Sequence, residues 1–436
     1  MELSVDQEKA FELFKRGKNI FISGPGGAGK SALINHIYKH VIETTQKTIQ
    51  ICALTGFAAT QINNKATTLH SWAGIGLGNG DVDSILKKIR RVPIKKGNWL
   101  NTHILIVDEV SQMSLKLFEL INAVAKRMRK NLGVFGGIQI VFVGDFYQIP
   151  PVGNEDDPDS YRYCFESDEW ESIFPPENCI ILNKIFRQKD EEFSAMLNQI
   201  REGKISKKNY QKLLSLVDRQ LDPTSPFIPT KLFPTKRQVD AVNQMEMDKL
   251  KEPIKSFEMK YIMDKSISDE DSTRSLDYLC KSIAVPKTMY LKKGCQVMYV
   301  VNNETDRGNK LFNGSCGIIT GFQETTGFPI VKFSAGFEEV VKPYNWTHET
   351  NQKMGVAQIP LILAWALTIH KAQGTTLDMA EMDIGNDIFE FGQTYVALSR
   401  VKSIEGLYLK AFNPSKIKIH KKVMEFYSNL KTLSSS

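Results

Sequence analysis

The chain has 436 residues, of which 42% are hydrophobic and 24% are charged. This length predicts two to four domains, and the composition excludes a chain that is disordered throughout. The six cysteines stand singly, without C-x-x-C pairs, which argues against a zinc site or a disulfide framework. We find no signal peptide, transit peptide or bilayer-spanning segment, so we expect a soluble protein in a reducing, intracellular compartment.

The net charge is +7, and basic residues cluster in two stretches, residues 87–96 and 416–422. Such clusters are typical of polyanion binding. A solvated helix face has the same composition, and charge by itself does not separate the two interpretations.

Residues 3–14 place apolar side chains at helical spacing, and the predicted helix carries Gln7. The amide of a glutamine ahead of a nucleotide site can pair with both a donor and an acceptor on adenine. A surface glutamine without such a role is the alternative.

The next stretch, residues 20–34, is typical of a phosphate-binding loop between a strand and a helix. Its pattern is G-x-x-x-x-G-K-[ST], in which bare backbone N–H groups and a helix N-terminus face the phosphate oxygens. Lys30 would add a charge for the outer phosphates, and the Ser31 hydroxyl could bind bridging magnesium. An ordinary glycine-rich turn is the alternative. The predicted ATP-binding residues in this loop are Gly24, Pro25, Gly26, Gly27, Ala28, Gly29, Lys30 and Ser31.

A second apolar strand over residues 49–55 runs into a corner of small residues that begins at Gly56. Residues 67–72 then combine hydroxyls, His70 and a tryptophan, a set that suits phosphate contacts and base stacking but also a core edge. The basic segment over residues 85–96 interrupts the strand and helix alternation, which indicates an inserted subdomain.

The apolar run over residues 104–107 predicts a strand buried on both faces, and Asp108 and Glu109 follow it. Asp108 is placed to hold magnesium, and Glu109 to orient and deprotonate the attacking water. Two adjacent carboxylates repel each other, so the pair makes sense mainly beside a cation. An acidic strand end without a role is the alternative.

A third buried strand over residues 138–143 leads to Gln148, which would lie at the same ligand-binding edge of the sheet. A glutamine there could sense the γ-phosphate, although an ordinary loop amide is the other interpretation. The acidic stretch after it, residues 155–159, reads as a linker.

The second half of the chain predicts another α/β domain that is interrupted by a small β-barrel. Arg187 and Arg400 are the candidates for reaching a γ-phosphate from this second domain. A surface ion-pair partner is the alternative for each, and it is the commoner role of a lone arginine. The α/β elements fall at residues 180–182, 193–202, 231–235 and 361–376, and the barrel strands at 296–301, 317–322, 329–333 and 338–341.

Taken together, these motifs resemble the Pif-one family of DNA helicases, within helicase superfamily one. The resemblance covers nearly the whole chain. Val134 stands where family members often have proline, and the long N-terminal extension of eukaryotic members is missing. The residues that carry it are LSVDQ (3–7), GPGGAGKS (24–31), LTGFAA (54–59), TTLHSWAGIGLG (67–78), ILIVDE (104–109), FGGIQIVFVGDFYQIPPV (135–152), FRQ (186–188), LFNGSCG (311–317), LAWALTIHKAQGTTL (363–377) and YVALSR (395–400).

The resemblance implies an α/β fold with two RecA-like, parallel-sheet P-loop domains. The first would span residues 1–66 and 101–175, and the second residues 176–250 and 355–436. The insertions would be a strand-separating wedge at 67–100 and a segment at 251–354 with an SH3-like barrel.

By motif, Gln7 would read adenine, Lys30 would bind the phosphates, and Asp108 and Glu109 would bind the metal and activate water. Gln148 would sense the γ-phosphate, and Arg187 and Arg400 would reach it from the opposite domain. Gly374 would also belong to the ATP site. The residues that would face single-stranded DNA are Thr55, Gly56, Phe57, His70, His370, Lys371, Tyr395 and Ser399.

The implied function is an ATP-dependent and magnesium-dependent DNA helicase of replication, repair or recombination, moving 5′ to 3′ on single-stranded DNA. Its partners would be single strands and strand–duplex junctions, with no membrane. We expect a monomer, with dimerisation on DNA as the alternative, acting in the nucleus or another site of DNA replication. A translocase or protein-displacing ATPase without productive unwinding is the competing function, and a P-loop kinase for a small molecule is the third.

Overall fold

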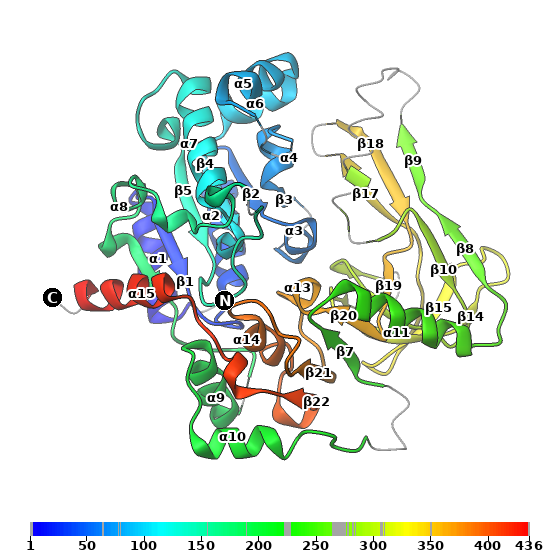
Figure 1. The fold of residues 1–436 in the computed structure, drawn as a ribbon. Coiled ribbons are helices and arrows are strands. Elements are labelled where there is room, and N and C mark those ends of the chain that lie inside the picture. Colours follow the sequence, from blue (N-terminus) through cyan, green and yellow to red (C-terminus); the bar gives the residue numbers. More distant parts are fainter. Residues whose placement is uncertain are drawn as a thin grey trace. The chain divides into compact units, whose positions relative to one another are not determined.

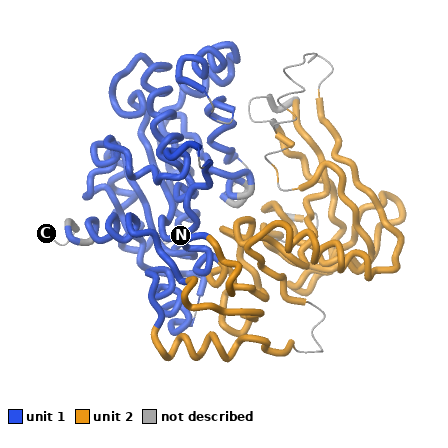
Figure 2. The backbone as a smooth tube through the Cα atoms, viewed as in Figure 1, with its two compact units in different colours: residues 1–205, 390–396, 417–436 blue, residues 206–389, 397–416 orange. Residues whose placement is uncertain are grey.

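A computed structural model describes residues 3–62, 65–76, 78, 80–154, 156–188, 190–221, 228–263, 276, 279–280, 283, 285–305, 308, 310–348 and 351–434. The chain forms two compact units (Figure 2). Unit 1 comprises residues 1–205, 390–396 and 417–436, and unit 2 comprises residues 206–389 and 397–416. Among the described residues, no helix combines the length and the apolar character that crossing a bilayer requires.

Unit 1 is built on a parallel six-stranded sheet (Figure 1). Its strands are nearly all apolar and buried on both faces, as the uninterrupted apolar runs predict. In spatial order they are β3 (Thr67–Thr68), β2 (Ile49–Ala53), β4 (Ile104–Asp108), β5 (Gln139–Val143), β1 (Ile20–Ser23) and β6 (Cys179–Ile181).

Alternate residues of these strands enter two separate cores. Ile20 and Ile22 pack with helices α1 and α2, whereas Phe21 packs with α7 and with the C-terminal helix α15. Helices therefore cover both faces of the sheet. The helices of this part of unit 1 are α1 (Val5–Lys15), α2 (Lys30–Thr44), α3 (Gly56–Ile62), α7 (Leu115–Arg129), α8 (Trp170–Ile173), α9 (Glu191–Arg201) and α15 (Lys421–Ser434).

The expected insertion at residues 67–100 forms three helices, α4 (Leu69–Ala73), α5 (Val82–Arg91) and α6 (Pro93–Asn101). Their apolar faces join the α7 side of the unit 1 core through residues such as Leu86, Ile89 and Trp99. The guanidinium of Arg129 donates to the carbonyl oxygens of Trp99 and Thr102 at 2.8 and 3.0 Å, which ties the end of α6 to α7. The basic residues of α5 consequently lie on a helix whose other face is buried.

Unit 2 contains a second parallel sheet and a set of antiparallel sheets. The parallel sheet orders β20 (Ala366–Thr368), β7 (Thr230–Phe233), β21 (Ala380–Ile384) and β22 (Leu407–Phe412). Its helices are α10 (Lys207–Leu214), α11 (Lys236–Lys249) and α13 (Ile369–Ala372), while α14 (Gln393–Leu398) crosses from unit 1 into unit 2.

The predicted barrel strands are confirmed as an antiparallel five-stranded sheet. Its order is β16 (Glu338–Val340), β15 (Pro329–Phe333), β14 (Cys316–Phe322), β11 (Gln296–Tyr299) and β19 (Leu361–Leu363). The smaller sheets pair β10 (Thr288–Leu291) with β8 (Lys255–Glu258), β12 (Asn303–Glu304) with β13 (Lys310–Leu311), and β17 (Tyr344–His348) with β18 (Asn351–Gln358) and β9 (Lys260–Met263).

The expected domain boundaries differ from the observed ones at four places. Thr67–Thr68, expected in the insertion, form β3, which pairs with β2 in the unit 1 sheet. Strand β6 pairs with β1, with Phe21 opposite Cys179, so residues 176–205 belong to unit 1 and not to the second domain. Residues 390–396 and 417–436 also return to unit 1, because α15 buries Val423 and Tyr427 in its core. The β-rich insertion extends beyond residue 354, since β19 pairs with β11.

Candidate nucleotide and nucleic-acid site

The phosphate loop connects β1 to α2 as the sequence predicts, with Gly29 capping α2 at φ 80°. A left-handed residue at this position favours glycine, and a Cβ there would lie 2.7 Å from the Gln7 amide nitrogen. Gly27, at φ 84°, lies against the backbone of Arg187, and an added Cβ would collide with the Arg187 Cβ. The loop is therefore closely enclosed by unit 1 itself.

Lys30 is the partly buried charge of this loop. Its Nζ donates to the carbonyl oxygens of Gly24 and Pro25 at 2.6 and 3.0 Å. Burial lowers the pKa of Lys30, while the carboxylates of Asp145, Glu109 and Asp108 raise it. The ammonium group thus sits in a field of three acidic side chains, and it is positioned to neutralise further negative charge.

Gln7 reaches the same loop from α1. Its Nε2 donates to the Gly29 carbonyl at 3.2 Å, and its Oε1 accepts from the Ser4 backbone N–H at 2.9 Å within a capping box. An amide has two donor hydrogens and two acceptor sites, so one of each remains for another group. Gln7 is thereby fixed beside the loop.

Asp108 and Glu109 follow β4 as expected. Asp108 is buried, and its Oδ1 accepts the Glu109 backbone N–H at 2.8 Å. Burial, together with the Glu109 charge, raises the pKa of Asp108 to about 7. Glu109 has a left-handed backbone at φ 56°, a conformation that costs free energy for a residue with a side chain and that is common in functional sites.

The loop after β5 contains an ion pair to which the sequence analysis assigned no role. Arg201, at the end of α9, donates from Nε and an Nη atom to the two carboxylate oxygens of Asp145, both at 2.8 Å. Asp145 also anchors the turn, because its backbone carbonyl accepts the Gln148 N–H at 2.9 Å. The position of Asp145 directly after a buried strand could have marked it as a site residue. Nothing in the sequence around Arg201 indicates that it pairs with Asp145.

Two tyrosines complete the enclosure of this loop. The Tyr427 hydroxyl, from α15, lies 2.6 Å from the Ser23 hydroxyl and accepts the Phe146 backbone N–H at 3.1 Å. The Tyr147 and Tyr427 rings stack at 4.5 Å, with Arg201 over the Tyr147 face at 4.5 Å. The C-terminal helix is thus attached both to the strand before the phosphate loop and to the segment around Gln148.

Tyr395 lies on the nucleotide side rather than where we expected a DNA contact. Its side chain is buried, and its hydroxyl accepts the backbone N–H of Gly26 at 2.9 Å. Arg187 also differs from expectation, because it lies in unit 1, the unit of Lys30. Burial lowers the pKa of Arg187, while Tyr395 and Glu109 raise it.

Arg400 and Ser399 lie in unit 2 and are both buried. The Arg400 guanidinium donates to the Ser399 hydroxyl at 2.6 Å and to the carbonyl oxygens of Ala372 and Thr375 at 3.3 and 3.4 Å. Gly374 lies between those two carbonyl residues with φ 82°. This arrangement fixes Arg400 to the turn after α13, with the buried Ser399 hydroxyl as one of its acceptors.

The remaining predicted DNA-facing residues are distributed over both units. In unit 1, Thr55 is exposed beside Gly56, the first residue of α3, and burial lowers the pKa of His70. The side chain of Phe57 lies outside the described residues. In unit 2, His370 and Lys371 are neighbours in α13.

Phe389 is an exposed aromatic residue that the sequence analysis missed. Its side chain is 65% exposed, and its ring stacks on that of His370 at 6.3 Å with an interplanar angle of 20°. Exposed stacked rings are the surfaces on which nucleic-acid bases pack. The only sequence signal was an aromatic residue in a polar segment, too common to be informative.

A family model described as PIF1-like helicase matches residues 2–211 of the chain. The chain is 35% identical to the ATP-dependent DNA helicase PIF1 of Emericella nidulans, over 95% of this chain and 61% of that protein. It is 32% identical to the ATP-dependent DNA helicase RRM3 of Saccharomyces cerevisiae, over 99% of this chain and 68% of that protein. It spans 61 to 64% of the length of the first three curated relatives.

The solved structures that this chain resembles are also Pif1 helicases. The fold is similar to the crystal structure of Pif1 helicase from Candida albicans, with a TM-score of 0.77 and 34% identity over 99% of both chains. Bacteroides sp Pif1 in complex with ADP-AlF4 matches with a TM-score of 0.79 and 25% identity, over 99% of this chain and 98% of that one. A structure described as two coordinating Pif1 helicases at forked duplex DNA matches with a TM-score of 0.68 and 26% identity. The match covers 99% of this chain and 98% of that one.

Proposed function

Because the chain belongs to the PIF1-like helicase family, we propose that it is an ATP-dependent DNA helicase that moves 5′ to 3′ along single-stranded DNA and separates duplex strands. The observation that carries the proposal is the group formed by Lys30, Asp108, Glu109 and Asp145 beside the phosphate loop. The relatives' names support DNA as the substrate, and the ADP-AlF4 complex of Bacteroides Pif1 supports ATP as the fuel. The direction of movement rests on family resemblance.

Magnesium fits this site, since a cation would stabilise the Asp108 carboxylate against the burial and the Glu109 charge that raise its pKa to about 7. Asp108 and the Ser31 hydroxyl would hold it. Beside phosphates, magnesium keeps several waters and takes only one or two protein ligands. When bound, it supplies charge that stabilises the leaving phosphate oxygens.

Hydrolysis would proceed by attack of water on the γ-phosphorus, with the bond to the β-phosphate oxygen breaking. Glu109 would orient that water and accept its proton, and Lys30 would compensate the charge on the outer phosphates. Gln7 would contact adenine through its remaining donor and acceptor. We further propose that Gln148, Arg187 and Arg400 contact the γ-phosphate, so that its loss is sensed when the phosphate leaves.

The DNA strand would contact Thr55, His70, His370 and Lys371, and the insertion at residues 67–100 would serve as the strand-separating wedge. The five-stranded sheet of unit 2 would be the SH3-like barrel that the family resemblance implies. A fork would be the natural substrate, and two copies acting on one fork agree with the related Pif1 structure. We place this activity at the site of DNA replication, in the nucleus if the host is eukaryotic.

The first test is ATP hydrolysis with and without single-stranded DNA, in the unaltered protein and in Lys30→Ala. Lys39→Ala is the matched control, because Lys39 lies on the same helix α2 with its side chain 73% exposed. We expect DNA to stimulate hydrolysis strongly in the unaltered and control proteins and not in Lys30→Ala. Hydrolysis indifferent to DNA would contradict the proposal and favour the P-loop kinase.

Strand separation is the second test. Partial duplexes with a 5′ tail or a 3′ tail are mixed with the protein and ATP, and the released strand is measured. Release only from the 5′-tailed substrate supports the proposed direction. DNA-stimulated hydrolysis with no release from either substrate would identify a translocase that does not unwind.

A further inference from the structure

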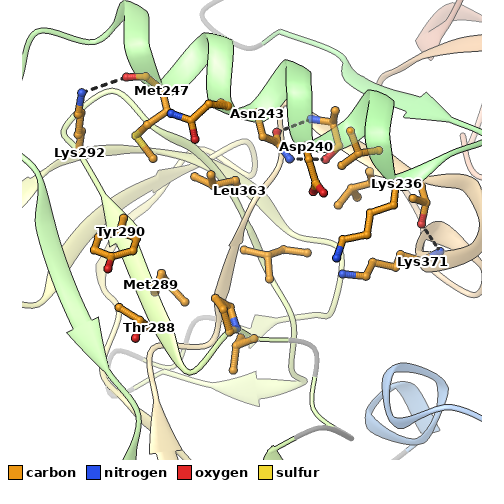
Figure 3. A pocket seen from close by; sticks show the side chains of 18 of the residues that line it. Lys236, Asp240, Asn243, Met247, Thr288, Met289, Tyr290, Lys292, Leu363 and Lys371 are labelled. Atoms are coloured by element: carbon orange, nitrogen blue, oxygen red, sulfur yellow. Dashed lines mark hydrogen bonds between the residues drawn. The ribbon is translucent and has the colours of Figure 1, made fainter.

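Unit 2 contains a pocket of about 540 Å³ between helix α11 and the strands β10, β19 and β20 (Figure 3). Every residue that lines it belongs to unit 2, so its shape depends on one compact part of the chain. The volume lies in the range of pockets that enclose a small ligand. The phosphate site described above uses none of its residues.

The body of the pocket is apolar. Val239, Met289 and Leu367 line it and are each less than a tenth exposed, while Leu363 is partly exposed and projects into the pocket (Figure 3). The polar Asn243 is already satisfied, because its side-chain amide exchanges two 3.0 Å hydrogen bonds with the backbone of Ala366. These bonds tie α11 to β20, so the wall is fixed at this point and suits an apolar group.

One end of the pocket is basic. Lys236 from α11 and Lys371 from α13 converge there with their ammonium groups directed towards each other (Figure 3). Neither ammonium group has a hydrogen bond or ion pair with another residue in the described part of unit 2. Partial burial lowers the pKa of Lys371, Lys236 lowers it further, and Asp240 opposes both. Two repelling cations at one place would be stabilised by an anion between them.

The opposite end offers no comparable charge. Lys292 lies there, but its Nζ donates to the carbonyl oxygens of Met247 and Leu250 at 3.1 and 2.8 Å, which caps α11. Thr288 donates its hydroxyl to Glu258 at 2.9 Å. Tyr290 is 54% exposed and presents its ring to the pocket (Figure 3). The ligand should therefore carry its negative charge at one end and a flat body towards Tyr290.

We propose that this pocket binds one nucleotide of the DNA strand, with a phosphate between Lys236 and Lys371 and the base against Leu363 and Tyr290. The inference rests on the proposed helicase function, which brings a strand to Lys371. A nucleotide combines one anionic end with a flat aromatic body, which matches the distribution of charge in the pocket. His370, stacked on Phe389, lies next in the chain, so a strand could pass from that ring pair to the pocket.

The test uses a fluorescein-labelled oligothymidylate with one internal 2-aminopurine, whose emission reports base stacking while fluorescein anisotropy reports overall binding. Leu363→Trp fills the pocket, and Met245→Trp is the control, on α11 with 47% exposure and outside the pocket. We expect a 2-aminopurine response in the unaltered protein and in the control that is clearly smaller in Leu363→Trp, with affinity falling about fivefold or more. Tyr290→Ala, at an exposed position, is the second variant should Leu363→Trp fail to fold.

An oligonucleotide with an abasic residue in place of 2-aminopurine separates the base from the phosphate. Its affinity should be lower than that of the intact strand and unaffected by Leu363→Trp, because the two changes remove the same contact. An unchanged 2-aminopurine response in both Leu363→Trp and Tyr290→Ala would overturn the pocket while leaving the helicase function intact. Failure of the unaltered protein to bind the strand at all would instead contradict the proposed function.

Discussion

The Arg201 guanidinium and the Asp145 carboxylate share two hydrogen bonds of 2.8 Å, and both side chains are almost fully buried. Burial alone would lower the pKa of Arg201, but the charge and hydrogen bonds of Asp145 hold it above its usual value. Asp145 also faces Lys30, whose pKa it raises. The pair therefore links the end of α9 to the phosphate loop, because the carboxylate that binds Arg201 also acts on the charge of Lys30.

Replacing Arg201 with alanine should destabilise the protein by about 3 to 5 kcal/mol, because Asp145 would remain buried without its partner. Urea unfolding measures this loss. Lys402→Ala, which removes an exposed pair with Asp378 at 2.7 Å, is the control and should change the stability little. A loss for Arg201→Ala no larger than that of the control would show that Asp145 finds compensation elsewhere.

Tyr427→Phe tests the attachment of the C-terminal helix to the phosphate loop. The variant removes only the hydroxyl that contacts Ser23 and the Phe146 N–H, so we expect a loss of about 1 to 2 kcal/mol in unfolding free energy. Because Ser23 precedes the loop, KM for ATP should also rise. Tyr161→Phe, at a position 48% exposed, should change neither quantity. An unaltered KM in a destabilised Tyr427→Phe would limit the hydroxyl to a structural role.

The raised pKa of Asp108 predicts a specific dependence of stability on pH. The unfolded carboxyl ionises near its ordinary value of 3.8, whereas the folded one retains its proton until about pH 7. The folded state thus binds more protons between these values, and without magnesium its stability should fall as the pH rises through this window. Asp108→Asn should remove this loss, stabilise the protein at pH 8 by up to about 4 kcal/mol and abolish ATP hydrolysis.

Urea unfolding at pH 5 and pH 8 in the presence of a chelator checks this prediction. Added magnesium should restore stability at pH 8 in the unaltered protein and not in Asp108→Asn. Equal stability of the two proteins at pH 8, with chelator present, would mean that Asp108 ionises without cost.

Phe389→Ala should weaken single-strand affinity about fivefold, because it removes the ring stacked on His370. Fluorescence anisotropy of a labelled oligothymidylate measures this change. Leu132→Ala is the control, as Leu132 is 92% exposed in unit 1 and outside the proposed DNA contacts. Identical affinities for the two variants would exclude stacking on Phe389, and unchanged ATP hydrolysis without DNA would show that the nucleotide site is intact.

The sequence by itself determined the phosphate loop, the carboxylate pair after β4 and the position of Gln148 at the sheet edge. These features depend on residues that are close in the chain, since a strand, a loop and a helix N-terminus position their own side chains. The strands of the antiparallel sheet in unit 2 were also predictable, because short alternating segments between glycine turns are local signals.

Only the tertiary structure decided which distant residues meet. Arg201 lies 56 positions from Asp145, and Tyr427 lies 282 positions from it, so no spacing rule connects them. Arg187 lies in the unit of Lys30, and not in the predicted second domain, because β6 hydrogen-bonds to β1. An apolar run of three residues does not specify that pairing. The pocket of unit 2 likewise depends on tertiary packing, because helix α11 and strands from three different sheets line it, and long-range packing of this kind leaves no periodic trace in the sequence.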